Sequence, residues 1–328
     1  MRIGLVYDLF DDYPWVDGEA FDADAENEPE ETVVALEAAC RALGHEPVRI
    51  GPARNLLSRM DNPGFDVGLS IAEGARSRNR EGEAPQLFEL MGVPFLGSDA
   101  LTMSLSLDKA WTKDLSVAAG VPTPAYRVYA NSDQCLEADL PGPFPLFVKP
   151  RYEGSAKGLT KESRVESFDA LRKQVNYVCR TYQQDALVEV FVEGGEFTVA
   201  VVGHDPERTL PVIQRAVEAT SGIGLHVLDR KGLPQEDHEW SLPSDLAPEL
   251  EAKLEADSLA IVRKLECRDF ARLDFRVDAN GTPWFLEINP LPTFAPDGTF
   301  AIMAELMGRS YPAFLASVLE EALRRVNS

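Results

Sequence analysis

The chain has 328 residues, and its 54 acidic and 32 basic side chains give a formal net charge of −22. This excess of acids argues against a nucleic-acid backbone as the main ligand, because phosphate backbones are bound by basic faces. Hydrophobic residues make up 45% and charged residues 26% of the chain, which is typical of a folded globular protein. At about 150 residues per domain, the length predicts about two domains.

The negative charge is concentrated near the N-terminus, where residues 3–40 contain twelve acids and no base. The chain has no run of about 18 apolar residues, and its N-terminus leads directly into a strand-like run. We therefore expect neither a membrane span nor a signal peptide. The four cysteines form no CxxC pair, which is typical of reduced thiols and favours a cytoplasmic protein.

The first part of the chain alternates between strand and helix patterns. In chain order we expect a strand at 3–7, an acidic loop at 8–30, a helix near 33–43, strands at 47–50 and 65–71, a helix at 84–91 and a strand at 93–97. This alternation predicts an α/β unit with a parallel sheet.

The rest of the chain divides into two further blocks. The second contains a helix at 108–119, a strand at 146–149, a Gly/Ser/Lys-rich loop at 151–160, a helix at 167–180 and a strand at 186–191. The third contains paired strands at 196–203 and 210–217, a helix at 246–265, a hairpin of 270–277 with 283–288 around Asn280-Gly281, and a helical tail at 301–326.

Three clusters could support chemistry, and the first surrounds Lys149. This lysine ends an apolar strand and is followed by a loop that contains Gly154, Ser155 and Gly158. A lysine followed by a flexible glycine-rich loop suits a polyphosphate, because the loop's backbone N–H groups can surround the phosphate oxygens. The alternative is a solvated Lys-Pro pair at the end of a strand.

The second cluster runs from Glu189 to Glu196. A strand ends there in a Gly-Gly turn, with two acids seven residues apart. A carboxylate can accept hydrogen bonds from ribose hydroxyls, and exposed main chain can bind adenine. Taken alone, the pattern favours the alternative, a plain β-turn with two solvated acids.

The third cluster lies on the predicted hairpin. Alternation places Arg272 and Asp274 on one face of the first strand, and Glu287 and Asn289 on one face of the second. If the hairpin pairs them, two carboxylates and an amide oxygen converge in a way that suits Mg²⁺ completed by water and phosphate. The alternative is an outward polar face with cross-strand salt bridges.

Taken together and in this order, the clusters resemble the ATP-grasp superfamily, and within it the D-alanine–D-alanine ligase branch. The resemblance covers residues 92–306. Its motifs are the Val93–Gly97 segment with Leu107-Asp-Lys109 and Ala119-Gly-Val-Pro-Thr-Pro124, the Lys149 loop, the Glu189–Glu196 segment, Arg272-Leu-Asp274 and Glu287-Ile-Asn289. Each motif is modest alone, but five in order are highly specific.

The resemblance implies an α/β fold of three domains, with ATP held between the last two. These would be an N-terminal preATP-grasp domain with a parallel sheet at 1–100, a central lid domain at 101–192 and a catalytic domain at 193–328. In this family a carboxylate attacks the ATP γ-phosphate to form an acyl phosphate, and an amine then displaces phosphate to form an amide. The branch is commonly dimeric, which implies a homodimer.

The resemblance also implies a role for each matching residue. Arg272 and Ser155 would stabilise the acyl phosphate and the tetrahedral intermediate. Asp274, Glu287 and Asn289 would bind two Mg²⁺ or Mn²⁺ ions. The residues implied to hold ATP are Lys109 and Lys149 at the phosphates, Gly154 and Ser155 in the lid, the Glu189 carbonyl and Val192 N–H at adenine, and Glu196 at the ribose.

The substrate-binding positions depart from the family pattern. Residues 8–15 replace a Gly-Gly-x-Ser-x-Glu loop, Glu73-Gly74 stands where a His-Gly pair is expected, residues 219–227 replace a tyrosine-rich loop, and Leu291-Pro-Thr293 replaces Pro-Gly. We therefore expect an ATP-dependent carboxylate–amine ligase acting on an amino acid or small peptide other than, or besides, D-alanine. The alternatives are an orthodox D-alanine–D-alanine ligase and a non-catalytic ATP-binding subunit.

The acidic segment lies where the family holds its first substrate. It can be a solvated loop that keeps the protein soluble. Alternatively, it selects a cationic substrate such as an amine-bearing amino acid, and the acids that would do so are among Asp8, Asp11, Asp12, Asp17 and Glu19, with Glu73.

Overall fold

The N-terminal sheet is parallel, as the alternation of strands and helices predicts. The computed structural model describes residues 1–218, 220–224 and 241–327. Across the first sheet the strand order is β2 (Glu46–Gly51), β1 (Arg2–Val6), β3 (Val67–Ser70) and β4 (Phe95–Leu96).

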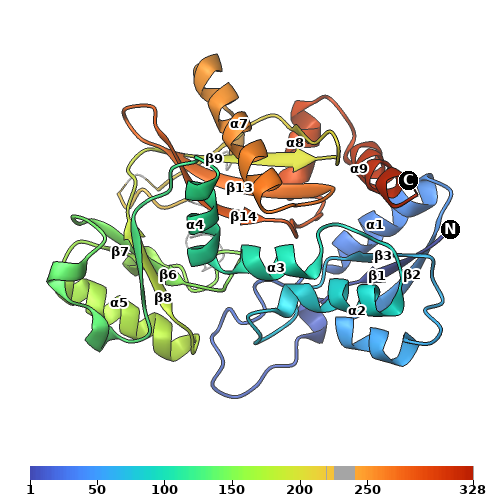
Figure 1. Cartoon of the computed structure of the whole chain (residues 1–328), viewed down its shortest axis with the longest axis horizontal. Helices are drawn as coiled ribbons and strands as arrows, with labels where there is room; N and C mark the ends of the chain where they lie inside the picture. The colour runs from blue at the N-terminus through green and yellow to red at the C-terminus, as the bar shows by residue number, and fades with distance from the viewer. Residues whose placement is uncertain (219, 225–240, 328) are drawn as a thin grey trace.

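Helices cover both faces of this sheet (Figure 1). On one face, Leu36 of α1 (Glu30–Ala42) belongs to the same apolar cluster as Ile3 and Leu5. On the other, Phe88 of α2 (Glu83–Met91) packs with Val6. Since neighbouring residues of a strand point to opposite faces, the continuous apolar run of β1 supplies apolar side chains to the core on both faces of the sheet.

The central sheet is antiparallel. Its order is β5 (Tyr126–Tyr129), β8 (Ala186–Val190), β6 (Leu146–Pro150) and β7 (Arg164–Val165). α5 (Phe168–Thr181) packs its apolar residues Leu171, Val175 and Val178 against it. The chain reaches this sheet through α3 (Ala100–Leu107) and α4 (Lys109–Ala118), whose first turns are capped by the Asp99 and Asp108 carboxylates.

The C-terminal sheet is also antiparallel and supplies the long strands of the molecule. Strands β12 (Ser241–Pro243), β11 (Ile213–Arg215), β9 (Gly195–Val202), β13 (Phe270–Val277) and β14 (Pro283–Asn289) lie in that order, and β10 (Arg208–Thr209) pairs with β9. α7 (Pro248–Lys264) packs against this sheet, whereas α8 (Thr299–Leu306) and α9 (Tyr311–Val326) follow it.

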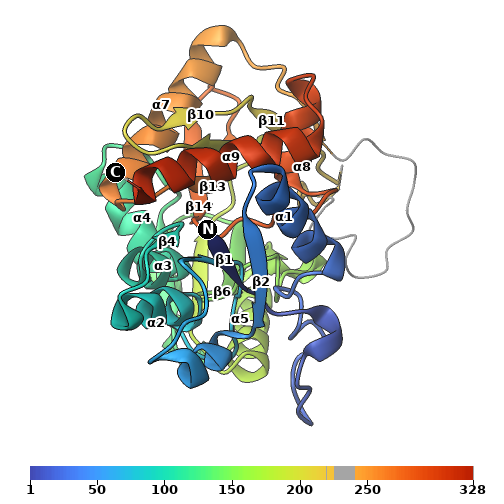
Figure 2. The same cartoon turned by 90° about the vertical axis from the view of Figure 1, so that its right-hand side faces the viewer.

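One apolar core joins the two ends of the chain. Phe314 and Leu319 of α9 belong to the same cluster as Leu36 and Cys40 of α1, and Phe270 of β13 extends the cluster toward the C-terminal sheet. Figure 2 shows α9 lying beside α1, across the N-terminal sheet. This packing fixes the N-terminal sheet against the strands that carry Arg272 and Glu287.

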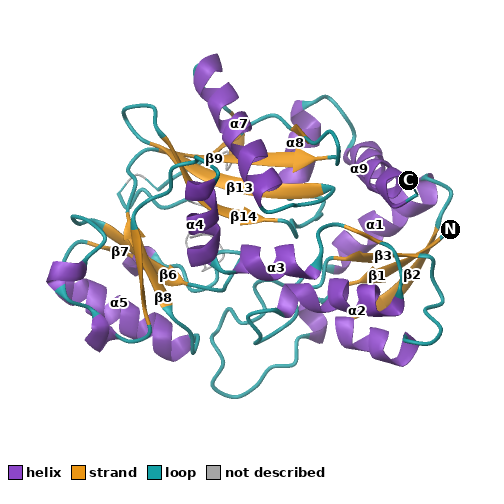
Figure 3. Cartoon of the chain, viewed as in Figure 1, coloured by secondary structure: helices purple, strands orange, loops and turns teal. Residues whose placement is uncertain are grey.

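The remaining connections are loops and short 3₁₀ helices (Figure 3). The 3₁₀ helices are η1 (Phe10–Asp12), η2 (Ala53–Arg59), η3 (Arg80–Gly82), η4 (Ser132–Gln134), η5 (Glu137–Asp139) and η6 (Lys161–Ser163). No helix in the described part of the chain is long and apolar enough to cross a membrane. The four cysteines, all within that part, are free thiols.

Two predicted elements differ from the structure. The expected helical tail at 301–326 is two helices, because Gly308 adopts a φ of +67° and Pro312 begins the first turn of α9. Of the expected strand at 210–217, only Ile213–Arg215 forms a strand (β11), and Pro211 lies between it and the preceding β10 at Arg208–Thr209. Proline has no N–H to donate to a strand ladder, which explains the interruption.

Candidate active site

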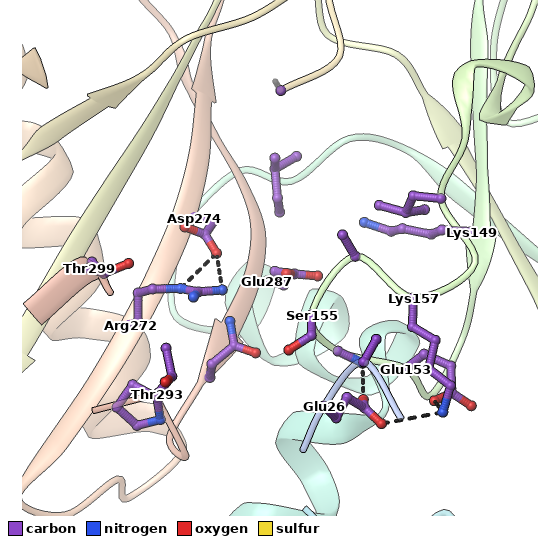
Figure 4. A pocket seen from close by; sticks show the side chains of 18 of the residues that line it. Glu26, Lys149, Glu153, Ser155, Lys157, Arg272, Asp274, Glu287, Thr293 and Thr299 are labelled. Atoms are coloured by element: carbon purple, nitrogen blue, oxygen red, sulfur yellow. Dashed lines mark hydrogen bonds and ion pairs between the residues drawn. The ribbon is translucent and has the colours of Figure 1, made fainter. Parts of the chain in front are cut away.

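All eleven predicted site residues line a single cavity. Its volume is about 800 Å³, and its walls come from strands of the central and C-terminal sheets together with loop and 3₁₀ residues of the N-terminal part. In Figure 4, Arg272, Asp274 and Glu287 stand on one side of this cavity, and Lys149 and the lid with Ser155 stand across from them. The eleven residues are Lys109, Lys149, Gly154, Ser155, Glu189, Val192, Glu196, Arg272, Asp274, Glu287 and Asn289.

The β13–β14 hairpin brings the third cluster together as predicted. Asp274 pairs with Glu287 across the ladder, and Arg272 pairs with Asn289. The alternate residues Leu273 and Ile288 are buried in the core beneath the sheet. Alternation therefore sends the polar set into the cavity and the apolar set into the core.

Asp274 is held on both sides by hydrogen bonds. Thr198 Oγ1 donates to its Oδ1 at 2.6 Å, and Arg272 lies 3.1 Å from its Oδ2 through Nη2. Burial alone would lower the pKa of Arg272, but Asp274 and Glu287 outweigh burial and raise it. Arg272 is therefore a permanent cation, and it faces the same cavity as Lys109 and Lys149.

The donor set on this hairpin fits a hard divalent cation. Within the described residues no group of three or more His, Cys, Asp or Glu side chains forms a metal cluster. Asp274, Glu287 and Asn289 supply two carboxylates and an amide, and Mg²⁺ usually completes such a partial set with water and phosphate oxygens. The Asn289 Nδ2 is buried without a hydrogen-bond partner among the described residues.

A buried charge triad lies behind the lysine of the first cluster. Glu189 forms ion pairs with Lys149 Nζ at 2.7 Å and with Lys113 Nζ at 2.6 Å, and all three side chains are almost completely buried. Burial would raise the pKa of Glu189, but the two lysines outweigh it and lower its pKa to about 2. Burial lowers the pKa of Lys113 to about 8, because Glu189 offsets it only in part.

Arg276 also lines the cavity, and Lys113 lies buried behind it; neither was predicted as a site residue. Arg276 Nη1 donates to the Val192 carbonyl at 3.0 Å, and its Nη2 lies 3.0 Å from Glu196 Oε2. Arg276 thus links the segment at 189–192, which is predicted to bind adenine, to Glu196, which is predicted to bind the ribose. Strand alternation carried a signal for it, since it lies two residues beyond Asp274 on the same face.

Lys109 connects the β13–β14 hairpin to the lid, the Gly/Ser/Lys-rich loop at 151–160. Its Nζ donates to the Glu153 carbonyl and lies 3.6 Å from Glu287 Oε2. Its place at the start of α4, beside the cap residue Asp108, points it into the cavity.

The N-terminal wall of the cavity is acidic. Glu26, Glu28, Glu73 and Glu81 line it. Burial and the neighbouring Glu81 and Glu26 carboxylates raise the pKa of Glu73 well above its usual range. Burial raises the pKa of Glu81 to about 7, a rise that Arg80 opposes and Glu26 reinforces.

The acidic-segment prediction needs correction. Asp8, Asp11, Asp12, Asp17 and Glu19 do not line the cavity, so they are not placed to contact a substrate within it. Asp8 instead accepts the Gly74 N–H, and Glu19 pairs with Arg76. Glu73 does line the cavity, as predicted. Of the divergent segment 219–227, residues 219 and 225–227 lie outside the described residues.

The raised pKa of Glu81 predicts a pH-dependent stability effect. A carboxyl group whose pKa is higher in the folded state supports folding below its unfolded pKa and loses that support as pH rises through about 7. The natural protein should therefore lose stability between pH 5.5 and pH 8.5, whereas Glu81→Gln should not lose it by this route. The Tm of Glu81→Gln minus the Tm of the natural protein should rise by about 3 °C or more between the two pH values. Thermal unfolding at both pH values measures it, with exposed Glu89→Gln as control. A gain independent of pH would contradict the assignment.

Comparisons with known proteins identify the family of this chain. Residues 115–320 match the family model described as D-ala D-ala ligase C-terminus. The chain belongs to the D-alanine–D-alanine ligase family. It is 34% identical over 279 residues to the D-alanine–D-alanine ligase of Cupriavidus taiwanensis, covering 80% of this chain and 82% of the relative. It is 30% identical over 296 residues to an uncharacterized protein of Sinorhizobium fredii, covering 88% and 86%.

The fold agrees with the family. The crystal structure of D-alanine–D-alanine ligase from Bacillus anthracis complexed with ATP aligns with a TM-score of 0.73 at 22% identity, over 100% of this chain and 98% of that one. The predicted ATP-grasp fold and D-alanine–D-alanine ligase-like branch are confirmed. The chain is an enzyme of the ATP-grasp ligase class.

Proposed function

We propose that this protein is an ATP-dependent carboxylate–amine ligase that joins an amino acid or small peptide to an amine through an acyl phosphate, releasing ADP and phosphate. One observation carries the proposal. The hairpin residues Arg272, Asp274, Glu287 and Asn289 share one cavity with Lys149 and the glycine-rich lid. Phosphoryl transfer depends mainly on positioned cations and oriented reactants, and this arrangement can supply both.

The residue roles follow from position around the cavity. Asp274, Glu287 and Asn289 would hold two Mg²⁺ ions, whose positive charge would stabilise the negative charge of the phosphates. Lys109, Lys149 and the lid residues Gly154 and Ser155 would hold the phosphates. The Glu189–Val192 hinge would bind adenine, with Glu196 at the ribose, and Arg276 would keep hinge and acid in register.

The chemistry divides into two displacements. A substrate carboxylate oxygen bonds to the γ-phosphorus while the bond from that phosphorus to the bridging oxygen breaks and ADP leaves. An amine nitrogen then bonds to the acyl carbon, the acyl carbon–oxygen bond breaks, phosphate leaves and the nitrogen loses a proton. Arg272, held by Asp274, would face the charge that develops on the acyl phosphate and on the tetrahedral intermediate.

D-Alanine is the specific alternative substrate, because the relative from Cupriavidus taiwanensis is a D-alanine–D-alanine ligase. The acidic N-terminal wall of the cavity instead favours a substrate that carries an additional amine. Incubation with ATP, Mg²⁺ and either D-alanine alone or pools of amino acids, followed by chromatography of nucleotides and mass spectrometry of products, separates these alternatives. ADP, phosphate and a condensed product support the proposal, whereas AMP and pyrophosphate would contradict an acyl phosphate.

Arg272→Gln should lower kcat by about 10²–10³-fold, because it removes a preorganised donor from the position where charge develops. Arg272→Lys should recover only part of the rate, since an ammonium group cannot reproduce the guanidinium fork. Steady-state kinetics with varied ATP measures both variants. A KM for ATP that rises while kcat stays unchanged would instead assign Arg272 to nucleotide binding.

A further inference from the structure

The acidic segment contacts the lid, residues 151–160, through two carboxylates, Asp22 and Glu26, to which the proposed chemistry gives no role. We propose that Asp22 is a positioning residue, whose carboxylate holds the lid in the conformation that faces the cavity. This inference rests on the proposed function in taking the lid as the phosphate-binding loop. It gives part of the acidic segment a role other than contact with substrate.

Asp22 joins the lid to the end of helix α5, where Tyr182 follows its last residue, through its two carboxylate oxygens. Its Oδ2 accepts the Gly158 N–H at 2.9 Å, and its Oδ1 accepts the Tyr182 hydroxyl at 2.8 Å. Only 8% of Asp22 is exposed, so both bonds lie away from water. Burial and the Asp22 charge raise the pKa of Tyr182, which keeps its hydroxyl protonated as a donor.

Gly158 packs so closely against Pro150 of β6 that only a glycine fits at this position. A Cβ built at this glycine would lie 2.4 Å from Pro150 Cγ, and its φ is +79°. Pro150 directly follows Lys149, the phosphate lysine of the proposed site. Holding the Gly158 amide therefore holds the end of the lid against the strand that carries Lys149.

Glu26 anchors the other end of the same turn. Its Oε1 accepts the Gly154 N–H at 2.5 Å and lies 2.6 Å from Arg80 Nη2. Between the two anchors, Ser155 and Ala156 have φ values of +48° and +58° and line the cavity. Non-glycine residues keep a left-handed conformation only where surrounding contacts stabilise it. The Asp22 and Glu26 carboxylates supply such contacts on either side of Ser155 and Ala156.

Loss of the Asp22 anchor should make the lid less ordered before nucleotide arrives. A nucleotide that needs the ordered lid would then bind more weakly, in proportion to the fraction of molecules still ordered. Hydrogen bonds to charged groups are strong enough that losing one corresponds to about a tenfold change. The effect should fall on ATP binding, because Asp22 does not line the cavity.

The test compares Asp22→Ala with Asp24→Ala in the full chain. Asp24 lies in the same segment and outside the cavity lining, so its removal controls for the loss of one negative charge. Hydrogen exchange of lid peptides in the nucleotide-free protein and steady-state kinetics with varied ATP are the readouts. Asp22→Ala should speed lid exchange and raise the KM for ATP about tenfold each, with kcat within about twofold. Asp24→Ala should change neither.

Two further variants keep the test decisive if Asp22→Ala does not fold. Tyr182→Phe should move lid exchange and KM in the same direction by a smaller factor, and Asp22→Asn should recover most of the Gly158 contact. Equal lid exchange and equal KM in the Asp22→Ala and Asp24→Ala proteins would overturn the proposal, as would an unchanged lid in Tyr182→Phe if Asp22→Ala does not fold. Absence of ATP turnover in the natural protein would refute the proposed function, whereas lid exchange would still decide the role of Asp22.

Discussion

Glu287→Gln should abolish ATP turnover while the protein stays folded. The substitution removes one of two carboxylates in the proposed metal set, and bound metal supplies several kcal/mol of transition-state stabilisation, so we expect kcat to fall by about 10³-fold or more. The side chain is 25% exposed, and its ion pair is a 3.6 Å contact with Lys109. The cost in unfolding free energy should therefore stay below about 1 kcal/mol.

A coupled assay of ADP release, with thermal unfolding on the same sample, measures both quantities. Glu249→Gln is the matched control, since Glu249 is exposed at the start of α7. The concentration of Mg²⁺ needed for residual activity should rise in Glu287→Gln alone. Turnover within tenfold of the natural protein would show that Glu287 is not a metal ligand.

Glu189→Gln should cause a large loss of stability. It leaves the buried Lys113 and Lys149 side by side without the carboxylate between them, and breaking a buried ion pair in this way typically costs about 3–5 kcal/mol. Burial already lowers the pKa of Lys113 to about 8. Since a lysine with a lowered folded pKa burdens the folded state most at low pH, the loss should shrink as pH rises toward 10.5.

Urea denaturation at pH 7 and pH 9.5 tests this expectation. Glu193→Gln serves as control, because Glu193 forms an exposed ion pair with Arg164 and should change stability by less than about 1 kcal/mol. A Glu189→Gln protein as stable as the control at pH 7 would show that the two lysines do not depend on Glu189.

Local patterns were enough to predict the hairpin that carries the site. The alternation of Arg272-Leu-Asp274 and Glu287-Ile-Asn289, with an Asn-Gly turn between the strands, determines which side chains share a face, and the observed register agrees. Likewise the caps and apolar spacing predicted α4 and α5 to within a residue or two. The assigned roles of the eleven site residues stay predictions until they are tested.

Contacts between distant segments could not be predicted in the same way. The pairing of Lys113 with Glu189 depends on how α4 packs against β8, which no spacing in the sequence specifies. The bonds from Asp22 and Glu26 to the lid join residues more than 120 positions apart. The charge of residues 3–40 suggested substrate selection by Asp11 and Asp12, whereas the structure places the buried acids Asp22 and Glu26 against the lid.

The most direct test of the acyl-phosphate mechanism is oxygen transfer from substrate to phosphate. Amino acids labelled with ¹⁸O in their carboxylates, supplied as D-alanine alone and as a mixed pool, are incubated with ATP and Mg²⁺, and the released phosphate is examined by mass spectrometry. The acyl-phosphate mechanism predicts one ¹⁸O atom in each phosphate released with a condensed product. Unlabelled phosphate, or label appearing in AMP, would contradict it.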